Sequence, residues 1–95
     1  MKTIHLKIDG DQLDFDQAHL RAKASAEDVL EDPILLSWYD RIRDRESPSG
    51  VSECHEDCEI PGCVEYASNR GGEIVVDINQ GTYLFCYRDL GEFKY

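Results

Sequence analysis

Apolar and polar side chains alternate in the first segment of the chain. The apolar Ile4, Leu6 and Ile8 fall on one side of an extended backbone, and the polar His5 and Lys7 fall on the other. This period of two predicts a strand with one buried face. The segment lacks the continuous apolar stretch of a signal peptide, so we expect it to be part of the fold.

The next segment carries the period of a helix. Asp14 and Gln17 are spaced as in a capping box, in which side chains bind the free amides at a helix start. The residues behind this cap form a narrow apolar stripe, and they are Ala18, Ala22, Ala26 and Val29. Small side chains along one face let a helix lie close to a sheet. Pro33 ends the pattern, because a proline ring cannot continue the helical backbone.

The remaining apolar segments predict strands. Residues 34–40, ILLSWYD, are compatible with a buried strand or with a second helix that starts at Pro33. We favour the strand, because the segment is rich in aromatic and aliphatic residues. Three more strands are expected at 64–68, 73–78 and 82–88, since two glycine-containing turns separate them.

Together these segments predict an α+β domain with the order β-α-β-long loop-β-β-β. We expect a two-layer sandwich, in which one helix packs on one face of a four- or five-stranded, mainly antiparallel sheet. A chain of 95 residues can bury one modest core, so residues 1–95 are expected to form a single domain. Residues 43–62 hold few apolar side chains and are expected to form a long acidic loop that carries cysteines.

Charge narrows the range of partners. Twenty acidic residues against ten lysines and arginines give a formal net charge of −10, which repels phosphate backbones and anionic lipid surfaces. No apolar run approaches the roughly 20 residues that span a bilayer. We therefore expect a cytoplasmic monomer or weak homodimer that binds a protein or a small molecule, and neither nucleic acid nor a membrane.

A histidine and three cysteines lie close together in CHEDCEIPGC, residues 54–63. Cys54, Cys58 and Cys63 could supply three zinc ligands, with His55 or Cys86 as the fourth, although the paired C-x-x-C spacing of structural zinc sites is missing. The alternatives are a disulfide to Cys86, a reactive thiol, or inert cysteines in a surface loop. A reducing cytoplasm disfavours the disulfide, and the neighbouring carboxylates disfavour a reactive thiolate.

The last predicted strand has two distinct faces. Cys86 shares one face with Leu84 and is expected in the core as a small apolar residue. Tyr83, Phe85 and Tyr87 share the other face. These rings are expected to form the packing surface of the sheet, or, if the helix covers the Leu84 face, a surface that binds a partner.

A catalytic constellation is not visible in the sequence. There is no P-loop, no G-x-G-x-x-G and no zinc-protease motif. Asp77, a charge inside a predicted strand, and His55 in the loop are the candidate acid–base residues.

Several short motifs in the second part of the chain resemble a family of small uncharacterised bacterial and archaeal proteins, a domain of unknown function. These motifs are DPILLSWYD at 32–40, SP at 47–48, EC at 53–54, PG at 61–62, YA at 66–67, RGG at 70–72, VDIN at 76–79 and GTYLFCYR at 81–88. The resemblance implies no activity, so it assigns no catalytic residue and no cofactor.

These observations predict a small binding or interaction module without catalysis. The first alternative is a zinc-binding protein that uses Cys54, His55, Cys58 and Cys63. The second is a small enzyme whose site lies at Asp77 or His55.

Overall fold

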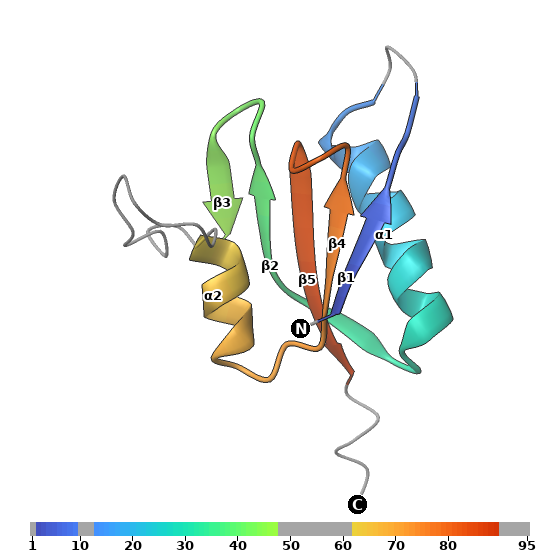
Figure 1. Cartoon of the computed structure of the whole chain (residues 1–95), viewed down its shortest axis with the longest axis vertical. Helices are drawn as coiled ribbons and strands as arrows, with labels where there is room; N and C mark the ends of the chain where they lie inside the picture. Colours follow the sequence, from blue (N-terminus) through green and yellow to red (C-terminus); the bar gives the residue numbers. More distant parts are fainter. Residues whose placement is uncertain (1, 10–12, 48–61, 90–95) are drawn as a thin grey trace, which may run out of the picture.

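A computed structural model describes residues 2–9, 13–47 and 62–89 of the chain (Figure 1). Within these ranges the elements follow in the order β1 (Lys2–Leu6), α1 (Phe15–Val29), β2 (Pro33–Asp40), β3 (Arg45–Ser47), α2 (Gly62–Ser68), β4 (Ile74–Ile78) and β5 (Tyr83–Asp89). The five strands form one sheet in the spatial order β1-β4-β5-β2-β3.

Helix α1 starts where the capping pattern predicts. The Asp14 side chain accepts a hydrogen bond from the backbone amide of Gln17 at 2.9 Å, which satisfies one of the free amides of the first turn. Three of the four stripe residues, Ala18, Ala22 and Ala26, are fully buried against the sheet, whereas Val29 at the end of the helix is 48 % exposed. Because their side chains are small, the helix backbone can lie close to the strands.

Three of the four strand pairings in the described sheet are antiparallel, and the pairing of β1 with β4 is parallel. The α+β class and the mainly antiparallel sheet, predicted with four or five strands, are confirmed, and the sheet has five strands. The strand over residues 34–40 is confirmed as β2. The parallel pairing arises because α1 carries the chain from one edge of the sheet to the far side of β5, and β4 later enters beside β1.

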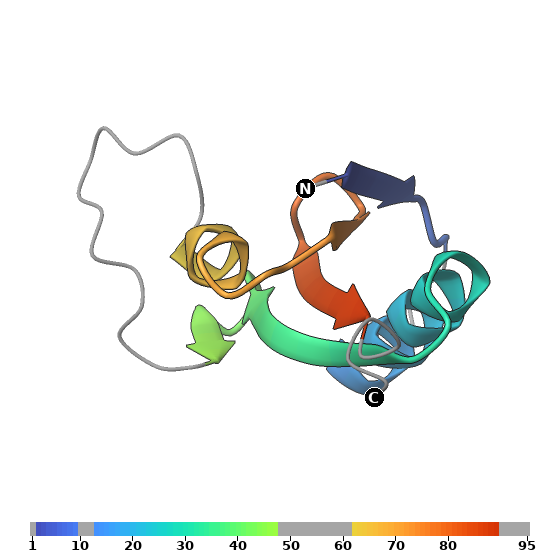
Figure 2. The ribbon, with the colours of Figure 1, turned by 90° about the horizontal axis from the view of Figure 1, so that it is seen from below.

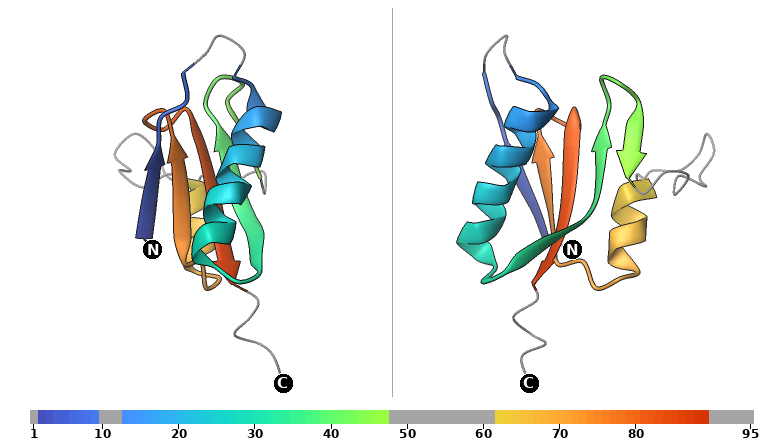
Figure 3. Two further views of the ribbon diagram at one scale, coloured as in Figure 1. Left: turned by 90° about the vertical axis from the view of Figure 1, so that its right-hand side faces the viewer. Right: turned by 180° about the vertical axis from the view of Figure 1, so that it is seen from behind.

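The two helices lie on opposite faces of the sheet (Figures 2 and 3). Helix α1 covers one face, where its alanines pack on the rings of β5 and on the apolar residues of β4 and β1. Helix α2 packs on β2 and β5 from the other face. Its residues Cys63 and Ala67 meet Val75, Leu84 and Cys86 there. Each face therefore has its own apolar cluster.

The strand predicted at 64–68 is wrong, because this segment belongs to α2. Cys63 and Ala67 are four residues apart and share one side of the helix, where both are buried. A short apolar run has no clear period, so packing against the sheet decides its conformation. The predicted layer count changes as well, since α2 adds a second helical layer and β3 occupies part of the expected loop.

The part of the chain that the structure describes holds no helix that is both long and apolar enough to cross a membrane.

Candidate functional site

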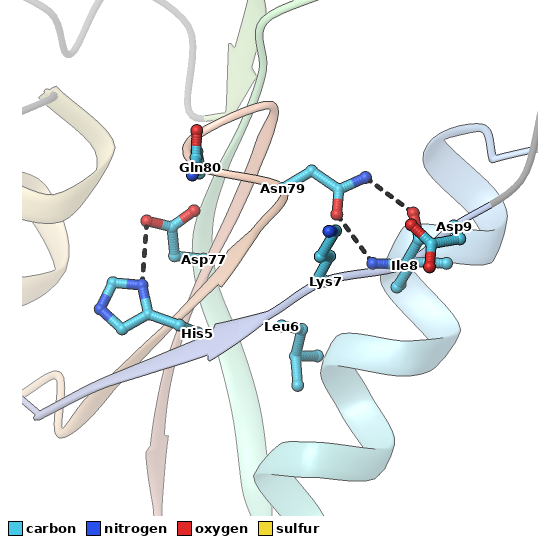
Figure 4. Close-up of a pocket in the computed structure, with 8 residues that line it drawn as sticks. All are labelled: His5, Leu6, Lys7, Ile8, Asp9, Asp77, Asn79 and Gln80. Atoms are coloured by element: carbon cyan, nitrogen blue, oxygen red, sulfur yellow. Dashed lines mark hydrogen bonds and ion pairs between the residues drawn. The ribbon is translucent and has the colours of Figure 1, made fainter.

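An open groove lies where β1 and β4 end, on the edge of the sheet (Figure 4). Its volume is about 920 Å³, and it is lined by residues 5–9 of the first segment and by Asp77, Asn79 and Gln80 of the second. β1 and β4 run parallel, so their carboxyl ends meet at this place. The groove therefore combines side chains that are far apart in the sequence.

The register of the parallel pair brings His5 and Asp77 together. They are direct neighbours across the two strands, and His5 Nδ1 lies 3.5 Å from Asp77 Oδ2. The His5 side chain is 75 % exposed and the Asp77 side chain 19 %. Because the carboxylate lies beside Nδ1, the other ring nitrogen, Nε2, is on the far side of the ring (Figure 4).

The turn after β4 holds the carboxylate of Asp77 in place. Asp77 Oδ1 accepts a hydrogen bond from the backbone amide of Gly81. The turn needs three successive residues with positive φ, which are Asn79 at 53°, Gln80 at 57° and Gly81 at 89°. Glycine adopts this conformation without strain, and asparagine tolerates it better than most residues. The turn thereby fixes one wall of the groove.

The other wall is tied to this turn by the side chain of Asn79. Its Oδ1 accepts a hydrogen bond from the Ile8 amide at 2.8 Å, and its Nδ2 donates one to the Ile8 carbonyl at 3.0 Å. The backbone amide of Asn79 also donates to the Leu6 carbonyl at 2.9 Å. The amide side chain thus extends the pairing of β1 and β4 beyond the last strand residue.

The groove offers both donors and acceptors to a ligand. Lys7 carries a positive charge, Asp9 a negative one, and Gln80 an exposed amide, while Leu6 and Ile8 contribute apolar surface. A few polar groups that converge on a hollow with apolar walls are typical of a binding site.

A second and smaller hollow of about 340 Å³ lies between the start of α1 and the end of β2. Its buried carboxylate and its guanidinium are already paired with each other, because Arg43 Nε lies 2.7 Å from Oδ2 of Asp40. The Arg43 guanidinium also lies 5.5 Å from the centre of the Phe15 ring. We therefore take the groove at His5 and Asp77 as the candidate site.

Comparison with known protein families shows which family the chain belongs to. Residues 1–87 match the family described as a domain of unknown function, DUF5619. The chain belongs to this family. The resemblance inferred from the sequence motifs is thereby confirmed.

A solved protein structure is similar to this chain over nearly its whole length. It is the crystal structure of a novel protein, AF1514, from Archeoglobus fulgidus DSM 4304. The two chains are 28 % identical, the TM-score is 0.73, and the match covers 94 % of each chain. Among curated proteins there is no significant match. The comparisons therefore support the fold and assign no activity.

Three of the four predicted zinc ligands, Cys54, His55 and Cys58, lie outside the described residues. The fourth, Cys63, is buried in α2 beside Cys86 of β5. No group of three or more metal-ligating side chains occurs within residues 2–9, 13–47 and 62–89. Zinc binding stays a prediction, and native mass spectrometry of protein purified without chelator would test it.

The two described cysteines form a buried polar contact in the core below α2. A hydrogen bond with Cys86 and burial raise the pKa of the Cys63 thiol. The Ser37 hydroxyl donates to the Cys63 carbonyl at 2.6 Å and also contacts the Cys86 thiol. The hydrogen bond between the two thiols lowers the pKa of Cys86. Both thiols are buried away from solvent, so neither is placed to react as a nucleophile. The core position predicted for Cys86 is confirmed.

The aromatic face of β5 lies under α1. Tyr83, Phe85 and Tyr87 are at most 2 % exposed and belong to the core cluster of the alanine stripe. Of the two interpretations drawn from the sequence, this burial supports the packing surface. A binding surface at these rings would require α1 to leave the sheet.

The sequence pointed to Asp77 as a site residue but not to the other polar residues that line the same groove, which include His5, Lys7, Asn79 and Gln80. The sequence holds only a weak indication of this groove. Polar side chains at the ends of two strands indicate a site only when the strands are known to be neighbours, and the parallel pairing of β1 with β4 is a tertiary property.

Proposed function

We propose that the protein is a small binding module whose ligand occupies the groove at the ends of β1 and β4. One observation carries this proposal. The groove of about 920 Å³ is lined by His5 and Asp77, whose side chains contact and orient each other. In open α/β sheets, ligands bind outside the carboxyl ends of parallel strands, and this groove has the same position relative to the parallel pair β1 and β4.

The rigid frame of the groove supports a binding role. Asp77 is held from two sides, by His5 and by the Gly81 amide. Asn79 clamps the segment after β1 through two hydrogen bonds to Ile8. A site whose polar groups are already oriented loses little conformational entropy when a ligand binds.

The lining favours binding over acyl transfer through a serine or cysteine nucleophile. None of the eight residues that line the groove is a serine, threonine, cysteine or tyrosine, so the described lining offers no hydroxyl or thiol nucleophile. His5 is largely exposed to water, which weakens its electrostatic interaction with Asp77. The cytoplasm is the compartment we propose, since free thiols persist there.

Chemical-shift mapping by ¹H–¹⁵N NMR tests the proposal. The probes are a fragment set of small carboxylates, phosphates, amines and amides, added one by one to the full chain. We expect shifts that cluster on the amides of residues 5–9 and 77–81. Binding of an amine probe is expected to weaken about tenfold in Asp77→Asn, because the variant loses the carboxylate that accepts a charge-assisted hydrogen bond from the ammonium group.

The matched control is Asp28→Asn, which removes the same charge from the exposed surface of α1. Binding in this control should equal that of the wild type. Shifts that cluster elsewhere, an absence of shifts with every probe, or equal losses in the two variants would contradict the proposal.

A further inference from the structure

The groove at the ends of β1 and β4 carries charges of both signs. Lys7, Asp9 and Asp77 all line it, and Lys7 makes no ion pair among the described residues. A simple anion would meet two carboxylates in a chain whose formal net charge is −10, and this charge repels it. A simple cation would leave the Lys7 ammonium without a partner. A ligand that carries both charges complements both kinds of group.

The backbone places Lys7 and Asp77 diagonally across the parallel pair. Asp77 lies directly opposite His5. Leu6 and Ile8 pack towards the α1 core, so the alternation of side chains puts Lys7 on the same side of the chain as His5. With a rise of about 3.3 Å per residue and a strand spacing of about 4.8 Å, the Cα atoms of Lys7 and Asp77 are about 8 Å apart. One small molecule fits between the two charged groups, and the flexible lysine stem adjusts to its length.

The Asp77 carboxylate is oriented and can still accept hydrogen bonds. Its Oδ1 accepts from the Gly81 amide, and its Oδ2 faces His5 Nδ1 at 3.5 Å. Each carboxylate oxygen has more than one lone pair, so an acceptor position stays open on both oxygens. The side chain is 19 % exposed, so an ammonium group can reach it from the groove. A charge-assisted hydrogen bond of this kind is about twice as strong as one between neutral groups.

The walls of the groove supply apolar surface beside these charges. Leu6 and Ile8 line the groove and are partly exposed, and the methylene groups of Lys7 extend this surface. An apolar group of a ligand would remove the surface from water. The Asn79 side chain is already bonded to Ile8 through both its oxygen and its nitrogen, so it holds the wall and leaves recognition to the charged groups.

From these observations we infer that the groove binds a free α-amino acid with an apolar side chain. Such a molecule carries an ammonium group, a carboxylate and an apolar group on one carbon, and these match the three kinds of group in the lining. The ammonium group donates to Asp77, the carboxylate accepts from Lys7, and the side chain lies on Leu6 and Ile8. This inference rests on the proposed function, since it names the class of ligand that the same groove accepts.

Titration of the full chain with three related probes, followed by ¹H–¹⁵N NMR, tests the need for both charges. L-Leucine is the complete ligand. The compound 4-methylpentanoate is leucine without its ammonium group, and 3-methylbutylamine is leucine without its carboxylate. Leucine should shift the amides of residues 5–9 and 77–81 and bind about tenfold more tightly than either truncated probe, because it alone makes both charge-assisted contacts.

Two variants assign each charge of the ligand to its group in the protein. Asp77→Asn should weaken leucine binding about tenfold and should not weaken binding of 4-methylpentanoate, because this probe has no ammonium group. Lys7→Gln should weaken leucine binding about tenfold and should not weaken binding of 3-methylbutylamine, because this probe has no carboxylate.

Two controls separate direct contact from the general field of the chain. Asp9→Asn removes the other carboxylate of the groove, and Lys23→Gln removes a lysine from the exposed surface of α1. Both variants should leave the affinity for leucine within a factor of about three, since their charges act only at a distance that salt screens.

Three results would overturn the inference: a truncated probe that binds as tightly as leucine, an unchanged leucine affinity in Asp77→Asn and Lys7→Gln, or a loss in Asp9→Asn as large as that in Asp77→Asn. The comparison of probes uses the wild type, so it decides the question even when a variant does not fold. If a truncated probe binds in the groove as tightly as leucine, the proposed function stands and the amino-acid inference fails. If no probe shifts residues 5–9 and 77–81, both fail.

Discussion

The two faces of the sheet differ in how completely a helix covers them. Beneath α1, three aromatic rings of β5 are closed off by a stripe of alanines. On the opposite face, α2 packs on β2 and β5. α2 also reaches β4 at Val75, whereas the His5 side chain of β1 on this face is 75 % exposed and lies beside Asp77.

The difference shows how one small sheet can hold both a core and a site. Large rings on the strands and small residues on the helix make the α1 face a continuous apolar layer, which stabilises the domain. The seven residues of α2 are too few to cover the whole of the second face. The open part of this face, at His5 and Asp77, is where the chain presents polar groups in a fixed arrangement. Four changes test this contrast between the two faces.

The largest loss of stability is expected when an aromatic side chain under α1 is replaced by alanine. Phe85 is fully buried, and its ring centre lies 5.5 Å from that of Phe15 and 5.4 Å from that of His19. Phe85→Ala should lower the free energy of unfolding by about 3–5 kcal/mol, because it leaves a cavity. Urea denaturation measures the loss.

The control for this change is Leu20→Ala, which truncates a side chain that is 62 % exposed on the same helix layer. It should cost less than about 0.5 kcal/mol. If Phe85→Ala does not fold, Phe85→Leu should show a smaller loss of about 1–2 kcal/mol. Equal losses in the buried and exposed variants would mean that the α1 face is not a packed core.

The second effect tests whether α1 needs small residues. Ala22 is fully buried between the helix and the sheet. Ala22→Leu should cost about 1–3 kcal/mol, because the larger side chain forces the helix away from the strands. Ala24→Leu, on the exposed side of the same helix, should be nearly neutral. Thermal unfolding of the two variants compares them, and a neutral Ala22→Leu would refute close packing.

The third change in stability concerns a buried tyrosine hydroxyl in the core under α1. Tyr87 Oη is buried and has no hydrogen-bond partner among the described residues, so Tyr87→Phe should raise the free energy of unfolding by about 1 kcal/mol. Burial raises the pKa of Tyr87 above its ordinary value of 10.0. The folded protein therefore binds this proton more tightly than the unfolded chain does.

The raised pKa of Tyr87 makes the stability of the protein depend on pH. The contribution of Tyr87 is fully present below pH 10 and is lost as the pH rises above 10, because ionisation is easier in the unfolded chain. The wild type should therefore lose stability between pH 9 and pH 11 more steeply than Tyr87→Phe, as measured by urea denaturation at several pH values. Parallel pH profiles of the two proteins would contradict the burial of the hydroxyl.

The smallest effect is expected on the open face. His5 is mostly exposed and its contact with Asp77 is solvated, so His5→Ala should change the free energy of unfolding by less than about 0.5 kcal/mol. Asp77→Ala should cost more, because it also removes the acceptor for the Gly81 amide. A loss above about 1.5 kcal/mol in His5→Ala would make the pair a structural element and not a binding group.

Local patterns were sufficient for much of the fold. The alternation around Leu6 predicts β1, the pair Asp14 and Gln17 marks the start of α1, and the alanine spacing identifies the face that α1 buries. The turn at Gly81 separates β4 from β5 as expected. Each of these features depends on neighbours within a few positions, and such neighbours are visible in the chain itself.

The conformation of α2 and the candidate site depended on contacts between distant segments. The run from Cys63 to Ala67 is too short for its period to decide between helix and strand, and packing on β2 and β5 makes it helical. His5 and Asp77 are unremarkable polar residues in the sequence, and they become a pair because β4 enters the sheet beside β1. The sequence thus determines which side chains each element presents. Tertiary structure decides which elements are neighbours, since that choice depends on burying the apolar faces of the whole chain at once.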